Sequence, residues 1–354
     1  MRNKAPKGRG AVSNSSGRYE SFIHEAFDDG WNSTDEPAEA LRTTLSVDSA
    51  RRVITYNRSP DIGFDRSVNP YRGCEHGCVY CFARPTHTWL GLSAGLDFET
   101  RLFYKPDAPE KLREELAERK YQCRPLALGI NTDAYQPVER KIGLTRRILE
   151  ILCETNHPVV LVTKSSLIER DLDILSEMAA KRLVSVSISI TTLSRNLARR
   201  LEPRAAAPER RIETLHRIAN AGIPAGLLLA PLIPVLTDGE MEHILRAARE
   251  AGAASAGYVL IRLPHEVSGL FSEWLSTHEP LKASHVLSRI RETRGGKNYD
   301  ARFGIRMSGT GDYAELLAQR FRLAVKKLGF GESPELNTEA FQPPRIGPRQ
   351  MSLF

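Results

Sequence analysis

Short apolar runs alternate with longer amphipathic stretches from residue 66 to residue 263, and this alternation limits the fold more than any other feature. Runs rich in Val, Ile and Leu are typical of buried parallel strands, and the stretches between them repeat apolar residues at helical spacing. We expect strands at residues 53–56, 66–69, 126–131, 158–163, 183–190, 224–229 and 257–262. We expect helices at residues 108–121, 139–155, 168–181, 207–221 and 238–251.

This pattern predicts an α/β fold in which strands pair in parallel through right-handed helical crossovers. A closed TIM barrel needs eight strand–helix units in about 250 residues, and only six are found here. We therefore expect a partial, open (β/α)6 TIM-like barrel across residues 53–265. Its ligand site should lie at the carboxyl ends of the strands.

The segments that flank the expected barrel differ from it in composition. Residues 1–52 are rich in Gly, Ser, Asn, Asp and Glu without sustained periodicity, so we expect a mobile N-terminal arm. Residues 266–330 should form a helical, basic C-terminal extension with helices at 279–294 and 312–328. Residues 331–354 are Pro-rich, and we expect an irregular tail.

Composition excludes several classes of protein. The longest nearly apolar run, residues 226–236, has 11 residues and two prolines, whereas a spanning helix needs about 20. The N-terminus lacks the apolar segment of a secretory signal. Five cysteines, three of them within eight residues, do not suit an exported disulfide framework. We expect a cytoplasmic protein without a membrane partner.

The three clustered cysteines form the loop Cys74-Glu-His-Gly-Cys78-Val-Tyr-Cys81. Thiolates are soft ligands that suit iron–sulfur clusters and zinc. No fourth cysteine is nearby, in contrast to the four-cysteine runs of ferredoxins, so one iron of a cluster would stay open to a substrate. The alternative is a zinc ion whose fourth ligand is a more distant side chain. The candidates for that ligand are His76, His87, Cys123 and Cys153.

This loop, placed ahead of a strand–helix series and with Tyr80 before its last cysteine, resembles the radical SAM superfamily. More narrowly, the chain resembles an uncharacterised bacterial branch related to spore photoproduct lyase, a DNA repair enzyme. The resemblance covers roughly residues 60–265. It rests on the segments NPYRGCEHGCVYCFAR, GINTDAYQPVE, LVTKS, SISITT, EPR and GIPAGLLLAPLIP.

The resemblance implies two cofactors. A [4Fe–4S] cluster would be held by Cys74, Cys78 and Cys81, and its open iron would bind S-adenosylmethionine. A flavodoxin- or ferredoxin-type partner would supply the electron. Reductive cleavage of S-adenosylmethionine would then give a 5′-deoxyadenosyl radical that abstracts hydrogen from a substrate.

The resemblance also points to residues that would hold S-adenosylmethionine. Asn131, Thr132 and Asp133 follow an expected strand, where the superfamily receives the amino group of this cosubstrate; an Asx turn or a helix N-cap is the alternative. Lys164 ends another strand and would reach the carboxylate, unless it is simply solvated.

Further candidates lie on and after the strand at 183–190. Ser187, Ser189 and Thr191 alternate and so share one face, which would point into the barrel; hydroxyls satisfied by the backbone are the alternative. Tyr80 belongs to the same cofactor-binding set. Arg195 and Glu202 follow this strand and are weaker candidates.

One departure from spore photoproduct lyase concerns its hydrogen donor. A cysteine at the end of the second strand has that role in the lyase, and Ile130 stands at this position here. Isoleucine has no labile S–H bond. We therefore do not expect photoproduct reversal by the same route.

The net charge of +7 is concentrated near the C-terminus. Residues 281–330 contain 11 Lys and Arg against 4 Asp and Glu, which accounts for the whole surplus. This surplus suits a DNA partner, although a solvated helix face would look the same. Candidate phosphate contacts are Arg289, Arg291, Arg294, Lys297, Arg302 and Arg306. Arg262 and His265 are candidate substrate contacts, with an Arg262–Glu266 pair as the alternative.

The last five residues, Gln350, Met351, Ser352, Leu353 and Phe354, resemble the bacterial sliding-clamp binding pentapeptide. Met replaces the first Leu and preserves its apolar volume. Prolines in residues 341–349 should keep this motif away from the body of the protein. The alternative is that the apolar terminus docks on the chain's own core.

We therefore expect a radical SAM enzyme that acts on DNA in repair or modification. One alternative is a non-catalytic iron–sulfur or electron-transfer module at the replication clamp. Another is a radical SAM enzyme that acts on RNA, protein or a small metabolite. An open iron distinguishes the two enzyme hypotheses from the electron-transfer module, because only an enzyme needs an open iron to cleave S-adenosylmethionine.

Overall fold

The computed structural model describes residues 6–20 and 41–345, and its main sheet has the strand order β10-β9-β8-β7-β6-β3-β2. The strands from β3 to β10 are parallel and follow chain order, while β2 is antiparallel to β3. Because β10 and β2 are the two edges, the sheet is an open, partial barrel as expected. The strands are β2 (Ile54–Tyr56), β3 (Arg66–Val68), β6 (Leu126–Leu128), β7 (Val159–Thr163), β8 (Val184–Ser189), β9 (Ala225–Leu232) and β10 (Ser255–Leu260).

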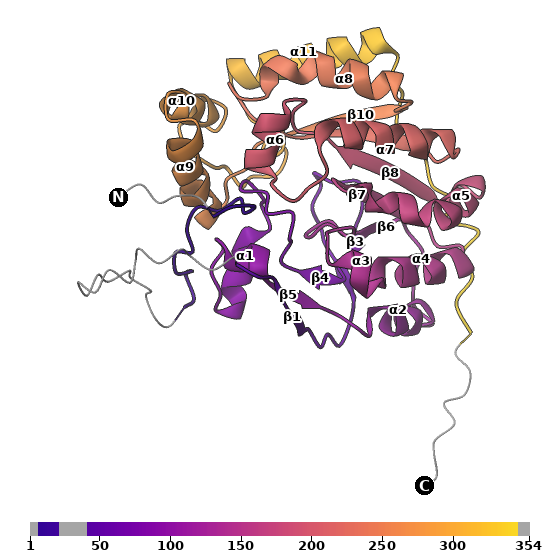
Figure 1. The fold of residues 1–354 in the computed structure, drawn as a ribbon. Coiled ribbons are helices and arrows are strands. Elements are labelled where there is room, and N and C mark those ends of the chain that lie inside the picture. Colours follow the sequence, from indigo (N-terminus) through magenta and orange to yellow (C-terminus); the bar gives the residue numbers. More distant parts are fainter. Residues whose placement is uncertain (1–5, 21–40, 346–354) are drawn as a thin grey trace.

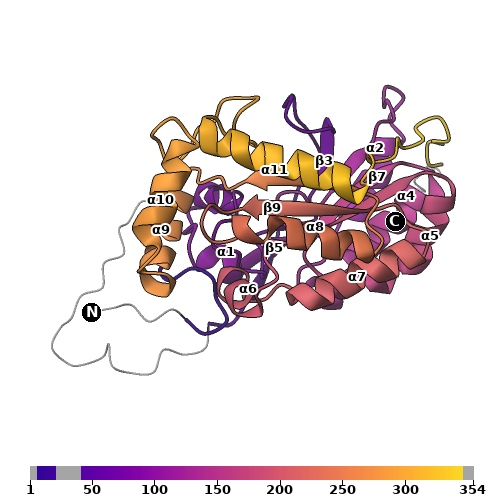
Figure 2. The ribbon, with the colours of Figure 1, turned by 90° about the horizontal axis from the view of Figure 1, so that it is seen from above.

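Helices cover one face of this sheet and lie side by side along it (Figures 1 and 2). The helix expected at 139–155 is divided at Gly143, whose φ of 70° interrupts the helical backbone. The helices between strands are α2 (Ala108–Leu116), α3 (Glu139–Ile142), α4 (Leu144–Glu154), α5 (Leu172–Ala180), α7 (Pro208–Asn220) and α8 (Met241–Glu250). Short 3-10 helices, η3 (Ser166–Asp171) and η4 (Asp238–Glu240), precede α5 and α8.

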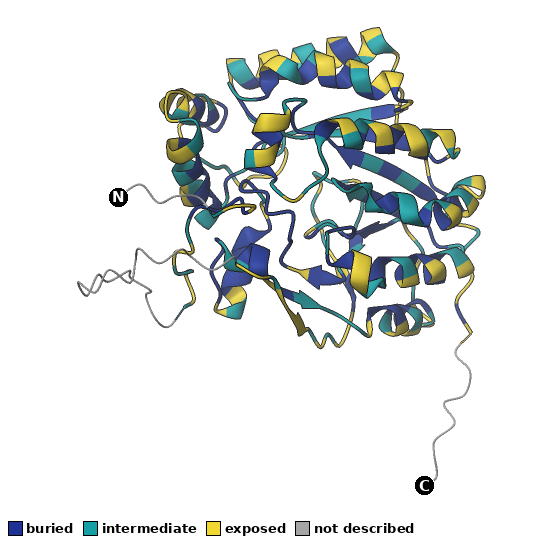
Figure 3. Ribbon diagram, in the orientation of Figure 1, coloured by how far each residue is buried: buried dark blue, intermediate teal, exposed yellow. Residues whose placement is uncertain are grey.

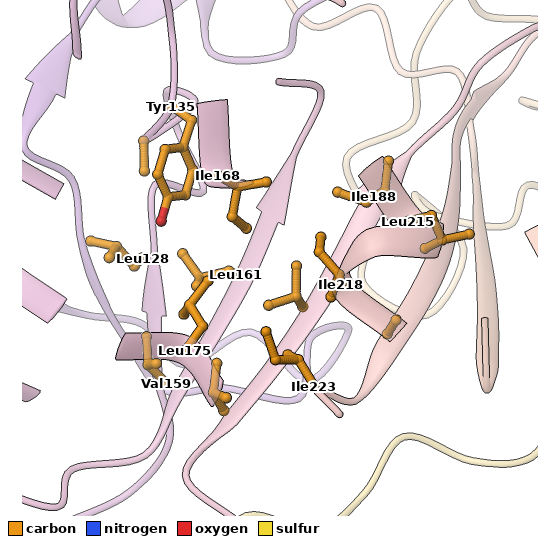
Figure 4. Packing of buried hydrophobic residues seen from close by; sticks show 14 of the residues in the cluster. Leu128, Tyr135, Val159, Leu161, Ile168, Leu175, Ile188, Leu215, Ile218 and Ile223 are labelled. Carbon is orange, nitrogen blue, oxygen red and sulfur yellow. The ribbon is translucent and has the colours of Figure 1, made fainter. Parts of the chain in front are cut away.

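The hydrophobic core fills the space between sheet and helices (Figures 3 and 4). In β8, Val184, Val186 and Ile188 are buried in this core together with Leu175 of α5 and Ile218 of α7. The serines that alternate with these residues point to the other face of the sheet. That inner face is therefore where polar side chains can gather without interrupting the core.

A second, smaller sheet flanks the barrel, and neither it nor its helix was expected from the sequence. Its order is β1-β5-β4. The bounds are β1 (Thr44–Val47), β4 (Tyr71–Arg72), η2 (Arg84–Leu90), α1 (Asp97–Thr100) and β5 (Arg101–Tyr104).

The expectation of a mobile arm is wrong for residues 9–12, which are buried. Arg9 donates a hydrogen bond of 3.0 Å to the Glu99 carbonyl, and Ala11 packs with Ala94 and Leu270. Small residues at positions 10 and 11 allow this close approach, and no periodic pattern signals it.

The C-terminal extension closes the gap between the sheet edges. The backbone N–H of Leu260 at the end of β10 donates to the Met307 carbonyl at 2.8 Å, and Asp61, between β2 and β3, binds Gly304 and Arg306. The extension also contains α9 (Glu266–His278), which was not expected, α10 (Ala283–Glu292) and α11 (Asp312–Leu328); α6 (Arg195–Leu201) precedes them in the barrel. Helix α11 packs beside α8 (Figure 2).

Residues 331–345 run along the amino ends of the barrel strands rather than away from the body. Gly331, Asn337 and Gln342 donate backbone hydrogen bonds of 2.9 Å to the carbonyls of Ala254, Arg182 and Thr155, respectively. Phe341 packs against the rings of Tyr121 and His157. The expectation that prolines keep the chain off the body is thus wrong for residues 341–344. The clamp-like motif at 350–354 lies outside the described residues.

Candidate active site

The cysteine loop lies between β4 and η2, at the end of the barrel to which the strands point (Figure 1). Cys74 and Cys78 are buried and Cys81 is half-buried, and all three are free thiols. The backbone N–H of Cys74 donates to the Phe98 carbonyl at 2.9 Å, and that of Cys81 donates to the Cys78 carbonyl at 3.2 Å. The loop is therefore tightly wound and anchored at its first ligand position.

A buried ion pair stabilises the backbone of the cysteine loop. The Arg84 guanidinium donates to the carbonyls of Cys78 at 2.8 Å and Gly77 at 3.2 Å, and it pairs with the fully buried Glu99 at 2.5 Å. Arg84 lies inside the segment that carries the family resemblance. Glu99 was not identified from the sequence, because its role depends on partners that are distant in the chain.

The N-terminal segment completes this support. Glu99 accepts hydrogen bonds from the backbone N–H groups of Gly10 at 2.9 Å and Ala11 at 2.8 Å. A Cβ atom on Gly10 would lie 1.7 Å from the Gly77 carbonyl oxygen, so only glycine fits against the cysteine loop here.

The surroundings of the three thiols favour their neutral form. Burial, aided by the negative charges of Asp133 and the other two cysteines, raises the pKa of Cys74. Burial also raises the pKa values of Cys78 and Cys81. A cation at the loop would reverse this preference, because metal binding requires thiolates and releases the protons.

The polar strip Asn131-Thr132-Asp133 follows β6, but its members have different surroundings. Asn131 is exposed. Thr132 is buried and donates to the Tyr71 carbonyl at 3.0 Å. Asp133 accepts from the Tyr135 backbone at 2.9 Å, which is the Asx turn named as the alternative.

Asp133 also connects the cysteine loop to β7. Its carboxylate accepts from Thr163 at 2.7 Å and from the Lys164 backbone at 2.8 Å, and it lies 3.3 Å from Nδ1 of His76 in the cysteine loop. Burial opposes ionisation, but the contact with His76 and these hydrogen bonds hold the pKa of Asp133 below its ordinary value.

Lys164 lies at the centre of the expected cosubstrate residues. Its Nζ donates to Ser189 at 2.7 Å, to Thr191 at 3.3 Å and to the Ala230 carbonyl at 3.0 Å, and it lies 3.2 Å from Glu202. Burial lowers the pKa of Lys164 to about 8. Lys164, Ser189 and Thr191 are thus brought together on the inner face of the barrel.

Glu202 joins Tyr80 to the same group. Its carboxylate accepts from the Tyr80 hydroxyl and from Thr191, and it forms an ion pair with Arg211. Tyr80 also lies 5.7 Å from the Lys164 ammonium, measured to the ring centroid. Arg211 is buried on α7 and was not identified from the sequence; its position in an amphipathic helix is the only local signal.

Two other candidates, Ser187 and Arg195, lie outside this group, as does Ile130 at the position of the lyase cysteine. Ser187 is deeper in the barrel, beside Gly226, whose Cβ would lie 3.0 Å from the serine Oγ. The Arg195 side chain is 73% exposed and faces Glu209 on the surface. Ile130, half-buried between β6 and the polar strip, has no acidic hydrogen.

The zinc alternative finds little support in the positions of its proposed ligands. His76 contacts Asp133, the His87 ring lies 2.8 Å from the Arg101 carbonyl, and Cys153 belongs to α4. Across residues 6–20 and 41–345, no group of three or more His, Cys, Asp or Glu side chains, the three loop cysteines included, is arranged to hold a single metal ion such as zinc.

Fold and site together define a class of protein. The family model of the radical SAM superfamily matches residues 68–248, which is more than half of the chain, and the chain belongs to this superfamily. It is a radical SAM enzyme, and S-adenosylmethionine is the cosubstrate that defines this superfamily. None of the helices in the described part of the chain is both long and apolar enough to cross a bilayer.

Two uncharacterised proteins are similar in sequence to this chain. An uncharacterised protein of Mycobacterium tuberculosis is 36% identical over 231 residues, which are 65% of this chain and 67% of the relative. An uncharacterised protein of Methanocaldococcus jannaschii is 28% identical over 173 residues, which are 49% of this chain and 62% of that protein.

Among solved structures, spore photoproduct lyase has a similar fold. Its complex with a dinucleoside spore photoproduct has a TM-score of 0.58, 15% identity, and covers 81% of this chain and 80% of its own. A cysteine-to-serine variant of the lyase gives a TM-score of 0.57 at 16% identity, with the same coverage.

Proposed function

We propose that this radical SAM enzyme acts on DNA, in repair or modification, and that Cys74, Cys78 and Cys81 hold its cluster. The observation that carries the proposal is the position of three unpaired thiols on one anchored loop at the carboxyl ends of the strands. The donor set fits the cluster, because three soft ligands leave one iron open. When bound, the reduced cluster supplies the electron that cleaves S-adenosylmethionine to methionine and a 5′-deoxyadenosyl radical.

The chain's own residues would bind and orient the cosubstrate. Lys164, Ser189 and Thr191 offer donors to a carboxylate or ribose, and Tyr80 lies beside them in the cysteine loop. Glu202 balances the charge of Lys164 until an anionic group arrives. Asn131 would contact the amino group of S-adenosylmethionine. Asp133 and Thr132 would instead position the cysteine loop, because protein groups already bind them.

DNA as substrate is supported by charge and by the fold shared with spore photoproduct lyase, one structure of which holds a dinucleoside photoproduct. However, several of the arginines predicted from the sequence to contact phosphate are already bound to other groups of the protein. Arg294 is buried and donates to the carbonyls of Leu260, Ile261 and Ile305, and Arg306 is bound to Asp61. Arg289 and Arg302 pair with Glu292 and Asp300, respectively. Exposed Arg291 and Lys297 remain as candidates.

The test is anaerobic reconstitution followed by measurement of 5′-deoxyadenosine, with and without ultraviolet-damaged DNA. We expect reductant-dependent product that increases when the DNA is added. A chain that takes up the cluster but forms no product would be an electron-transfer module. Product that responds to RNA, protein or a metabolite but not to DNA would contradict the substrate assignment.

A further inference from the structure

Arg262 lies at the mouth of the barrel, directly beside the cysteine loop. It follows the end of β10 by two residues. Its guanidinium carbon is 4.4 Å from the centroid of the Phe82 ring, and Phe82 is the residue after Cys81. The Phe82 side chain is 39% exposed. A cation therefore lies over a partly exposed aromatic ring next to the last cysteine.

The guanidinium of Arg262 lacks the partners that neighbouring arginines have. Arg294 donates to three backbone carbonyls and Arg306 binds Asp61, and Glu266 pairs with Arg18 rather than with Arg262. Within residues 6–20 and 41–345, no hydrogen bond or ion pair engages the Arg262 guanidinium. Burial lowers the pKa of Arg262, so an anion placed against it would relieve an unfavourable environment.

The chemistry of this pair suits a nucleotide. A guanidinium binds phosphate through two parallel hydrogen bonds, and an aromatic face accepts a stacked base whatever its identity. A second pair lies on the loop that bridges the two sheet edges: the Arg306 guanidinium is 4.6 Å from the centroid of the Phe303 ring, and Phe303 is 58% exposed. Stacking rings interleaved with cations are typical of surfaces that bind single strands or extruded bases.

We propose that Arg262 and Phe82 form a subsite for one phosphodiester and its adjoining base, which holds a nucleic-acid strand against the reactive centre. The choice of a nucleic acid rests on the proposed function, whereas the need for an anion follows from the unpartnered guanidinium. Phe303, beside Arg306, would offer a second ring on which a base can stack.

The test compares two thymidine dinucleotides, one with a phosphodiester and one with an uncharged methylphosphonate linkage. Binding is measured by calorimetry to reconstituted protein with S-adenosylmethionine present. We expect the wild type to prefer the phosphodiester by about tenfold or more, because one charged hydrogen-bonded contact differs. Arg262→Gln should bind both probes equally. Arg119→Gln, an exposed arginine after α2, removes the same charge elsewhere and should keep the preference.

Two further variants separate charge from stacking. Arg262→Lys keeps the charge but not the planar fork, and we expect it to retain part of the preference. Phe82→Leu should lower the affinity for both probes equally, by about fivefold or more, because the aromatic ring on which a base would stack is lost. Iron content and circular dichroism identify any variant that fails to fold, and Arg262→Lys then carries the test.

Several results would overturn the subsite. These are no preference in the wild type, a preference that survives in Arg262→Gln, or a loss of S-adenosylmethionine affinity with unchanged dinucleotide binding; the last would assign Arg262 to the cosubstrate. Failure of the proposed function is seen separately, as absent 5′-deoxyadenosine or no response to DNA. A charge preference that depends on Arg262 would establish the subsite even if no cleavage occurred.

Discussion

At the scale of single residues, Glu99 connects the cysteine loop to the rest of the chain. Its fully buried carboxylate is satisfied by the Arg84 guanidinium and by two backbone N–H groups of the N-terminal segment. A buried charge is tolerated only when its hydrogen bonds are complete. The three thiols are thus held by groups that contact the loop's backbone and leave the sulfur atoms free.

The first prediction concerns those thiols. Cys74→Ala, Cys78→Ala and Cys81→Ala should each abolish the cluster, because two remaining ligands cannot hold it. The wild type should bind about four iron and four sulfide per chain, measured by iron and sulfide analysis after anaerobic reconstitution. Cys123→Ala and Cys153→Ala should keep the wild-type content. Stoichiometric zinc without iron uptake would contradict the assignment.

The second prediction concerns pH. His157 is fully buried, its Nδ1 lies 3.0 Å from the Pro158 carbonyl, and its Nε2 lies 2.7 Å from the Tyr121 hydroxyl. Burial lowers the pKa of His157 from 6.5 to about 4. Between pH 6.5 and pH 4, His157 is protonated in the unfolded chain but not in the folded chain. The free energy of unfolding therefore decreases as pH falls from about 6.5 towards 4.

Urea unfolding of His157→Gln should isolate this effect. The free energy of unfolding that the substitution removes should be smaller at pH 5 than at pH 8 by about 2 kcal/mol. His216→Gln, at an exposed position on α7, serves as the control and should show no such difference. Equal losses at both pH values in His157→Gln would show that His157 is not held neutral.

At the scale of elements, the N-terminal segment and the cysteine loop form one unit. Gly10→Ala should displace the segment, since the new Cβ would lie 1.7 Å from the Gly77 carbonyl oxygen. We expect the free energy of unfolding to fall by about 1–3 kcal/mol and the reconstituted protein to lose iron faster in air. Gly63→Ala, where nothing lies within 4 Å, is the matched control. Unchanged iron loss in Gly10→Ala would mean that the segment does not protect the loop.

Some helices and strands could be predicted from the sequence, and others could not. Five of the six parallel strands, β6 to β10, were expected because each is a local apolar run, and α11 was placed at residues 312–328 by its own periodicity. The sixth, β3, is Arg-Ser-Val and has no such pattern. Strand β1 was missed because it is fully exposed and is defined by pairing with β5, which lies far along the chain.

The candidate site likewise contains residues that local sequence patterns indicate and contacts that they do not. Lys164 and the serine face of β8 follow from strand periodicity. The contacts of Asp133 with His76 and Thr163 join separate segments, so no local pattern indicates them. The buried role of Arg294 is equally non-local, because a guanidinium that caps carbonyls has the same sequence signature as one that faces phosphate.

At the scale of the whole molecule, the two ends of the barrel have different tasks. The cysteine loop, Lys164 and the Arg262–Phe82 pair lie at the carboxyl ends of the strands. Residues 331–345 instead pass along the amino ends, anchored at Ala254, Arg182 and Thr155. The described chain therefore stops far from the mouth (Figure 1). A partner of the C-terminal motif would bind the part of the chain that follows this segment.

The last prediction concerns such a partner. Leu353 and Phe354 are adjacent apolar residues that suit a preformed hydrophobic groove, Met351 adds a softer contact and Gln350 a hydrogen bond, and we propose that they bind the sliding clamp. Affinity from so few residues should be micromolar, about −8 kcal/mol.

Deleting residues 351–354 should abolish clamp binding in surface plasmon resonance and leave iron content and S-adenosylmethionine cleavage unchanged, because the described contacts of the tail with the barrel are made by residues 331–345. Phe341→Ala is the complementary variant. It should loosen the contact with Tyr121 and His157 and lower stability, while clamp affinity persists, because the binding residues remain. A deletion that destabilises the fold, or full-length protein that does not bind the clamp at about 50 micromolar, would mean that the terminus serves the chain's own core instead.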